Sequence, residues 1–276
     1  MTDRLVSDDR DTERLEEQDG HSRAIFLRRT ALGGGTLLAG GSLLSGVAEA
    51  QGKRHRRDDD EHHDRDHHRD DDDDHGSKGN KATDIKILNY ALTLEHLEAV
   101  FYTQGLQAFS RSDLKGADQL DGAGDRLRNS VYDYFILIRD HEQTHVKTLT
   151  AVIKSLGGNP VPPCEYNFAQ TAFTSPEKFI AVAQVLENTG VMAYDGAIAY
   201  IEAAALQTAG ATIATVEARH ASYLNLINEV VPFPAAFDTP KAPQEICKLV
   251  DSQFIVRCPF DLAAFCASLP NKVIAP

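Results

Sequence analysis

The segment LIRDHEQTHVKTL, residues 137–149, guides the interpretation of the chain, because it carries a glutamate and a histidine three positions apart in a helical pattern. Positions i and i+3 share one face of an α-helix, so the side chains of Glu142 and His145 project toward the same side. A single pair of this kind is commonly a surface contact. The same spacing recurs in VEARHASYL, residues 216–224, where Glu217 and His220 form a second pair.

These two pairs belong to a longer internal repeat. The stretch LEHLEAVFY, residues 94–102, aligns with LENTGVMAY, residues 186–194. Two glutamates and two tyrosines coincide in this alignment: Glu95 with Glu187, and Tyr102 with Tyr194. The sequence therefore predicts two copies of one helical hairpin. Each copy gives one glutamate from its first helix and a Glu-x-x-His pair from its second.

Apolar periodicity predicts four long helices, over about residues 83–109, 125–156, 175–207 and 210–229. Thr83 or Asp84 can cap the first helix, and Ser175 can cap the third, with Pro176 in its first turn. Residues 157–174 contain three prolines and no periodicity, so they form a long connection. We predict an all-α fold, a ferritin-like four-helix bundle with one long crossover between its second and third helices.

The residues of the repeat predict a metal centre. Four carboxylates on inward stripes of Leu, Ile, Val and Ala would each lose several kcal/mol of solvation if left unpaired. Two divalent cations would balance their charge, and four carboxylates with two imidazoles are the ligands of di-iron and di-manganese bundles. The predicted cofactors are two Fe or Mn ions. The alternative is that each stripe is rotated by about 100 degrees, one residue of a helix, so that the glutamates face solvent.

Residues 84–234 resemble the ferritin-like superfamily, and in particular its exported bacterial branch of ferritin-like or desiccation-related proteins. The motifs LTLEHLEAVFY, HEQTH, LENTGVMAYDGAIAY and VEARHASYLN carry this resemblance. It implies a di-metal centre in which two carboxylates bridge, two are terminal and each metal has one nitrogen ligand. The implied roles are bridging for Glu142 and Glu217, terminal for Glu95 and Glu187, and nitrogen ligation for His145 and His220.

Several neighbours of these residues are open to two interpretations. Glu98 lies three residues after Glu95 and is kept as an additional ligand candidate, although the repeat places Gly190 opposite it. Tyr102 and Tyr194 follow the ligand glutamates by two turns, and we expect them to hydrogen-bond the carboxylates, carry electrons, or serve as core aromatics.

Four further polar residues adjoin the candidate ligands. Each histidine next to a ligand glutamate points about 100 degrees away from it, which predicts a surface position. The aspartates of this group could orient the ligand imidazoles, although helix angles favour neither strongly. The two histidines are His96 and His141, and the two aspartates are Asp140 and Asp195.

The N-terminal part of the chain has a different character. Residues 1–50 are predicted to be a twin-arginine-type signal peptide, with Arg28 and Arg29 before a Gly-rich, weakly apolar run. An ordinary secretory signal is the alternative. Residues 51–81 are rich in His and Asp and contain no apolar side chain, which predicts a disordered linker, with loose cation capture as the alternative role.

Charge and cysteine content narrow the function classes. The net charge of −13 disfavours nucleic-acid binding, because an acidic surface repels phosphates. The bundle is predicted over residues 82–234, followed by a C-terminal extension, residues 235–276, that holds three of the four cysteines. An even number of cysteines in an exported chain permits disulfides, but their connectivity is left open. No nucleophilic triad or phosphate-binding loop is recognisable.

The leading hypothesis is an exported di-metal protein, in the periplasm or outside the cell, that reacts with oxygen, peroxide or ferrous iron. The alternative is a stress- or desiccation-associated structural protein whose metal site only stabilises the fold. An iron-storage shell is a third interpretation. The expected partners are these small molecules and the twin-arginine export machinery, with no stable membrane span and with oligomerisation left open.

Overall fold

A computed structural model describes the backbone of residues 74–274 and the side chains of residues 81–274. The predicted signal peptide and most of the predicted linker lie outside these described residues. The described elements are, in chain order, α3 (Asp74–Ala108), α4 (Arg111–Lys115), η2 (Asp118–Leu120), α5 (Asp125–Ser155), β1 (Glu165–Tyr166), α6 (Pro176–Ala197), η3 (Ile198–Tyr200), α7 (Ala204–Ile227), α8 (Pro243–Phe254), β2 (Ile255–Arg257) and α9 (Leu262–Ala267).

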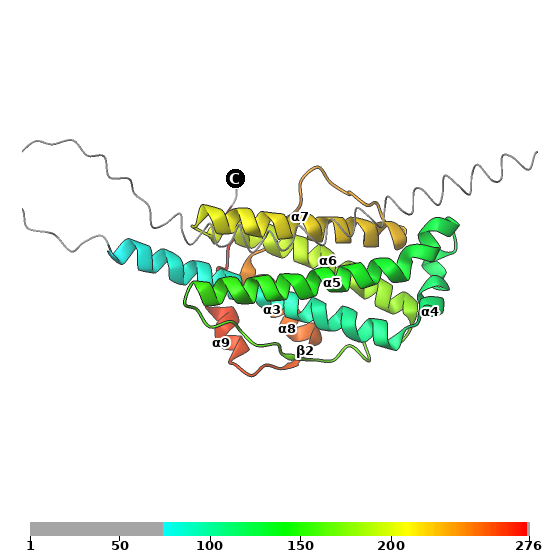
Figure 1. The fold of residues 1–276 in the computed structure, drawn as a ribbon, viewed down its shortest axis with the longest axis horizontal. Coiled ribbons are helices and arrows are strands. Elements are labelled where there is room, and N and C mark those ends of the chain that lie inside the picture. The colour runs from blue at the N-terminus through cyan, green and yellow to red at the C-terminus, as the bar shows by residue number, and fades with distance from the viewer. Residues whose placement is uncertain (1–73, 275–276) are drawn as a thin grey trace, which may run out of the picture. The chain divides into compact units, whose positions relative to one another are not determined.

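Four long helices dominate the described part of the chain (Figure 1). Helix α3 packs mainly along α5, and α6 packs mainly along α7, as expected for two helical hairpins. Their facing sides bury large apolar residues, among them Phe101, Phe135 and Phe179. The ring centroid of Phe179 lies 5.0 Å from that of Phe101 and 5.2 Å from that of Phe135. The mainly helical prediction is confirmed. Within the described residues, no helix combines the length and apolarity that a membrane span requires.

The start of α6 follows the local sequence signal. The Ser175 side chain accepts a hydrogen bond of 3.2 Å from the backbone N–H of Lys178, and Pro176 occupies the first helical position. Serine satisfies an N–H group that has no partner within the helix, and proline costs nothing where no N–H is needed. The crossover therefore ends where the sequence predicts, and α6 presents Glu187 on its buried side.

The boundary between α6 and α7 was predicted wrongly. Helix α6 ends at Ala197 rather than near residue 207, and Gly210 lies inside α7. The connection between these helices is bonded by Asp84, which lies within α3 and is not an N-cap, because that helix begins at Asp74. The buried Asp84 carboxylate accepts hydrogen bonds from the backbone N–H groups of Glu202 (2.7 Å) and Ala203 (3.3 Å). A side chain distant in sequence thus binds two N–H groups of the residues that immediately precede α7.

Two connections contain short elements that the sequence did not predict. The polar loop between α3 and α5 holds α4 and η2, and Ser110 with Asp113 forms a capping box at the start of α4. The crossover pairs with the C-terminal segment through the antiparallel strands β1 and β2. These strands have only two and three residues, too few for side-chain alternation to be visible in the sequence.

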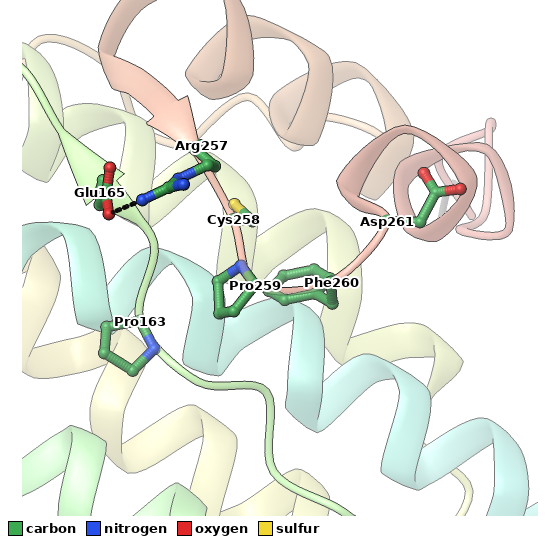
Figure 2. A pocket seen from close by; sticks show the side chains of 7 residues that line it. All are labelled: Pro163, Glu165, Arg257, Cys258, Pro259, Phe260 and Asp261. Carbon is green, nitrogen blue, oxygen red and sulfur yellow. Dashed lines mark hydrogen bonds and ion pairs between the residues drawn. The ribbon is translucent and has the colours of Figure 1, made fainter.

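The C-terminal segment is fastened to the crossover and to itself. Disulfides join Cys164 to Cys258 and Cys247 to Cys266. Figure 2 shows the first bond's surroundings, where Arg257 and Glu165 form an ion pair of 2.5 Å beside a surface pocket. None of the pocket's lining residues belongs to the predicted metal centre.

Candidate metal centre

The four long helices bring the six predicted ligands together inside the fold. The four glutamates have 0% exposure, so the alternative that they lie on a solvated face is wrong. Both histidines are also buried. The inward stripe of α3 gives Glu95, that of α5 gives Glu142 and His145, that of α6 gives Glu187, and that of α7 gives Glu217 and His220.

The six side chains form two overlapping groups. Candidate ligand atoms within each group all lie within 4.8 Å of one another. The first group is Glu95, Glu142, His145 and Glu217, and the second is Glu142, Glu187, Glu217 and His220. Glu142 and Glu217 belong to both groups, so their carboxylates lie between the two histidines. The arrangement follows the internal repeat of the sequence.

Each imidazole faces several carboxylate oxygens through one nitrogen. His145 Nδ1 lies 3.1 Å from Glu95 Oε2, 3.0 Å from Glu142 Oε2 and 3.2 Å from Glu217 Oε1. His220 Nδ1 lies 3.1 Å from Glu142 Oε1 and from Glu187 Oε2, and 3.9 Å from Glu217 Oε2. One ring nitrogen carries at most one proton, so it cannot satisfy three acceptors.

Three buried carboxylate oxygens lack a hydrogen bond, and this observation tests whether metal ions fit the site. They are Glu142 Oε1 and both oxygens of Glu217. The histidine nitrogens are near enough to pair with them by charge, but the contacts do not have hydrogen-bond geometry. An uncompensated buried carboxylate is costly. Carboxylate oxygens and imidazole nitrogens are ligands of iron and manganese, so the residues fit two such ions.

The pKa values of the cluster also reflect the cost of burying several carboxylates close together. Burial, and then the neighbouring carboxylate of Glu142, raises the pKa of Glu217 well above its ordinary value. Burial raises the pKa of Glu142 to about 7, although the neighbouring imidazoles of His145 and His220 oppose this shift. Burial alone would lower the pKa of His220, but the carboxylates of Glu187 and Glu142 raise it to about 11. The pKa of His145 is also raised, because the carboxylates of Glu95, Glu142 and Glu217 outweigh the lowering effect of its burial. The cluster therefore binds protons more tightly than isolated carboxylates and imidazoles do.

The two tyrosines of the repeat bind the terminal carboxylates in a crossed arrangement. Tyr102 donates its hydroxyl hydrogen bond, of 2.5 Å, to Glu187 Oε1, and Tyr194 donates to Glu95 Oε1. Each tyrosine therefore holds the glutamate of the other hairpin, not the one on its own helix. The expected tyrosine–carboxylate hydrogen bond is present, with the partners exchanged. All four side chains are buried.

Glu98 adds a fifth buried carboxylate beside the two groups. Its exposure is 4%, and burial, followed by the charge of Glu217, raises its pKa well above the ordinary value. Gly190 makes room for it, because a Cβ atom at this position would lie 3.3 Å from Glu98 Oε1 and 3.4 Å from Glu217 Oε2. The glycine that the repeat places opposite Glu98 thus leaves space for that carboxylate.

The prediction that His96 and His141 are surface residues is wrong, because both are half-buried and bonded. His141 Nδ1 lies 2.9 Å from His220 Nε2, and His96 Nε2 lies 3.1 Å from the backbone oxygen of Val161. Burial, followed by the charges of His220 and His145, lowers the pKa of His141 to about 4. His141 points away from the ligand next to it on α5, but it still reaches the ligand His220 on α7.

The aspartates considered as partners of the imidazoles do not serve in that role in the described structure. The side chain of Asp140 is exposed to solvent and forms an ion pair of 2.7 Å with Arg139. Asp195 is half-buried, and burial with the charge of Asp238 raises its pKa. No sequence signal marks His141 in their place, because only the packing of α5 against α7 creates its contact with His220.

Comparisons with known proteins agree with this architecture. A family model described as the ferritin-like domain matches residues 83–229, more than half of the chain. Protein rds1 of Schizosaccharomyces pombe is 27% identical over 176 residues, which cover 64% of this chain and 40% of that protein. The chain thus matches about two fifths of the length of this curated relative.

Proposed function

Because the chain belongs to the ferritin-like domain family, we propose that its buried cluster binds two iron or manganese ions and is redox-active. The observation that carries this proposal is the set of three unbonded oxygens on Glu142 and Glu217, which lie between two imidazole nitrogens at 0% exposure. A buried arrangement of this kind is costly without cations. The family and the donor chemistry both support metal binding.

The two overlapping groups suggest how the ligands would divide. Glu142 and Glu217 belong to both groups and would bridge, while Glu95 with His145 and Glu187 with His220 would complete the two positions. When bound, iron or manganese supplies one-electron chemistry toward dioxygen or peroxide, or for the oxidation of ferrous iron as a substrate. The protein's own contribution is to hold the carboxylates in place and to exclude bulk water from them.

The tyrosines have a defined part in this proposal. Tyr102 and Tyr194 orient the terminal carboxylates by donating hydrogen bonds to them. Hydrogen-bonded partners of metal ligands fix their orientation and tune their basicity. Burial, followed by the charge of the bonded glutamate, raises the pKa of each tyrosine well above its ordinary value. Both phenols therefore keep their protons at neutral pH and remain donors.

A structural role for the metal is the second candidate. It is favoured by the raised pKa values of Glu98 and Glu217, which follow first from burial and second from the charges of neighbouring carboxylates. Cations would offset both costs and stabilise the fold whether or not the site turns over. The stress- or desiccation-associated role belongs to this candidate.

Export stays a proposal, as does membership of the exported bacterial branch of the superfamily. All four cysteines form disulfides, which persist mainly in oxidising compartments. This supports a location in the periplasm or outside the cell. The twin-arginine motif lies outside the described residues, so export through that pathway rests on the sequence alone. A fusion of residues 1–50 to a reporter, with and without Arg28 and Arg29 replaced by lysine, tests it.

The proposed function is tested on protein purified from its native host. Metal analysis should find two iron or manganese ions per chain, and oxygen or peroxide consumption should require them. Glu142→Ala should lose both metal and turnover, whereas Glu245→Ala, on the surface, should lose neither. Bound metal that raises the melting temperature without any turnover would support the structural role. Protein without bound metal, which also fails to take up Fe²⁺ or Mn²⁺, would overturn both candidates.

A further inference from the structure

One histidine outside the six predicted ligands contacts a ligand directly. His141 Nδ1 lies 2.9 Å from His220 Nε2, and the two rings are nearly parallel, at 10°, with their centroids 5.2 Å apart. His220 turns its other nitrogen, Nδ1, toward the carboxylates of Glu142 and Glu187. The contact with His141 therefore lies on the outer side of the ligand, away from the cluster.

The direction of this hydrogen bond follows from the chemistry of imidazole. A histidine that binds a metal through Nδ1 must carry its remaining proton on Nε2. His220 Nε2–H is then the donor, and His141 Nδ1, without a proton, is the acceptor. His141 is half-buried on α5, and its sequence neighbour Glu142 faces the cluster, so the backbone that places the bridging carboxylate also places the acceptor.

Among the described residues, the other hairpin repeat provides no such contact to His145. The repeat matches Glu217 with Glu142, so the counterpart of His141 is Val216, which offers no acceptor. In the described part of the chain, the hydrogen bonds of His145 all involve Nδ1, and none involves Nε2. The two histidine ligands are therefore equivalent toward the carboxylates but differ on their outer sides.

We propose that His141 is a positioning residue that holds His220 in the orientation and tautomer for ligation through Nδ1, and so makes the two metal positions inequivalent. This inference rests on the proposed function, since it needs metal at the cluster. Removing the group that accepts a hydrogen bond from a ligand imidazole typically weakens metal affinity by about 10- to 100-fold. The position that uses His220 should lose affinity by this factor, and the position that uses His145 should keep it.

The test is a calorimetric titration of the metal-free full chain with Mn²⁺. His141→Ala should weaken one of two binding steps by about 10- to 100-fold. His141→Gln, whose amide oxygen can accept a hydrogen bond from His220 Nε2–H, should keep most of the wild-type affinity. The matched control is His96→Ala. His96 is likewise half-buried and adjacent to a ligand, but it bonds a backbone oxygen. Its replacement should leave the difference between the two steps unchanged.

A second measurement keeps the inference testable if His141→Ala does not fold. Long-range ¹H–¹⁵N spectra of the metal-free wild-type protein should show His141 with its proton on Nε2 and none on Nδ1. A protonated Nδ1 on His141 would overturn the inference, as would two steps weakened equally by His141→Ala. Wild-type protein that binds no Mn²⁺ or Fe²⁺ would instead overturn the proposed function, so the two failures are distinguishable.

Discussion

Tyr102 of α3 donates its hydrogen bond to Glu187 of α6, 85 residues away, and not to Glu95 on its own helix. Tyr194 makes the reciprocal bond back to Glu95. Each hairpin therefore supplies a carboxylate together with the donor that holds the other hairpin's carboxylate. Within one hairpin, therefore, the terminal glutamate does not have the tyrosine that bonds it, because that tyrosine belongs to the other hairpin.

Replacing either tyrosine by phenylalanine should weaken metal binding. Tyr102→Phe and Tyr194→Phe each leave one oxygen of a buried carboxylate without its donor, so that carboxylate loses its fixed orientation. We expect Mn²⁺ affinity to fall by about 10-fold or more in each variant. Tyr200→Phe is the control, since its hydroxyl bonds the backbone of Lys272 instead. Equal titrations of all three variants would refute the role assigned to the crossed bonds.

Replacing Glu217 by glutamine should separate stability from metal binding. The pKa of Glu217 is raised by burial and by the neighbouring carboxylates, so its charge destabilises the metal-free fold. Glu217→Gln should raise the melting temperature in the presence of a chelator and abolish the further rise caused by Mn²⁺. Thermal unfolding with and without metal measures both effects. A lower melting temperature in chelator would show that the charge is already compensated.

Stability of the metal-free protein should fall as the pH rises from about 5 to 8. Between its ordinary value of 4.5 and its folded pKa of about 7, Glu142 holds its proton better in the folded state. His220 does the same from 6.5 up to about 11. His141, with its pKa of about 4, opposes this below pH 6.5, but the raised pKa values of Glu98 and Glu217 outweigh it. The folded state therefore binds more protons across this window, and each extra proton lowers stability by about 1.4 kcal/mol per pH unit.

Metal should reverse this trend, because it binds the deprotonated ligands and displaces those protons. The rise in melting temperature caused by Mn²⁺ should be larger at pH 8 than at pH 5. Thermal unfolding at both pH values, in chelator and in Mn²⁺, measures the effect. If the melting temperature in chelator increases over this range, the pKa shifts assigned to Glu142 and His220 are wrong.

The hydrogen bonds of Asp84 to the segment before α7 should be sensitive to a single substitution. Asp84→Ala removes the acceptor for the two backbone N–H groups of Glu202 and Ala203, and leaving them unpaired should cost about 1–3 kcal/mol of unfolding free energy. Asp84→Asn keeps one acceptor oxygen and should cost less. Denaturant unfolding of the three proteins gives the values. An Asp84→Ala protein as stable as wild type would mean that water replaces these two hydrogen bonds.

The sequence predicted those features that depend on residues along one helix. Glu142 with His145 and Glu217 with His220 share a face by helical spacing alone, and the repeat then indicated Glu95 and Glu187. Burial confirmed the orientation of these stripes, while metal ligation by these residues stays a proposal. The start of α6 was predictable because Ser175 and Pro176 act locally.

Apart from the short loop elements, such as α4 with its local capping box, the features that the sequence did not predict arise between helices. Asp84 binds the residues just before α7 from another helix, a contact that no local signal marks. His141 reaches His220 across the interface of α5 and α7, which helical angles on α5 alone do not show. The disulfide pairing depends on how the crossover meets the C-terminal segment, and cysteine spacing does not encode that meeting.

The disulfide between Cys164 and Cys258 closes a covalent ring that contains all of α6, α7 and α8. Three candidate ligands, Glu187, Glu217 and His220, therefore lie inside the ring, and the other three lie outside it. Within the ring, Phe233 and Phe237 are 78% and 88% exposed, on a segment that a protease can reach. A single cut there would release no fragment, and the two pieces would separate only after reduction.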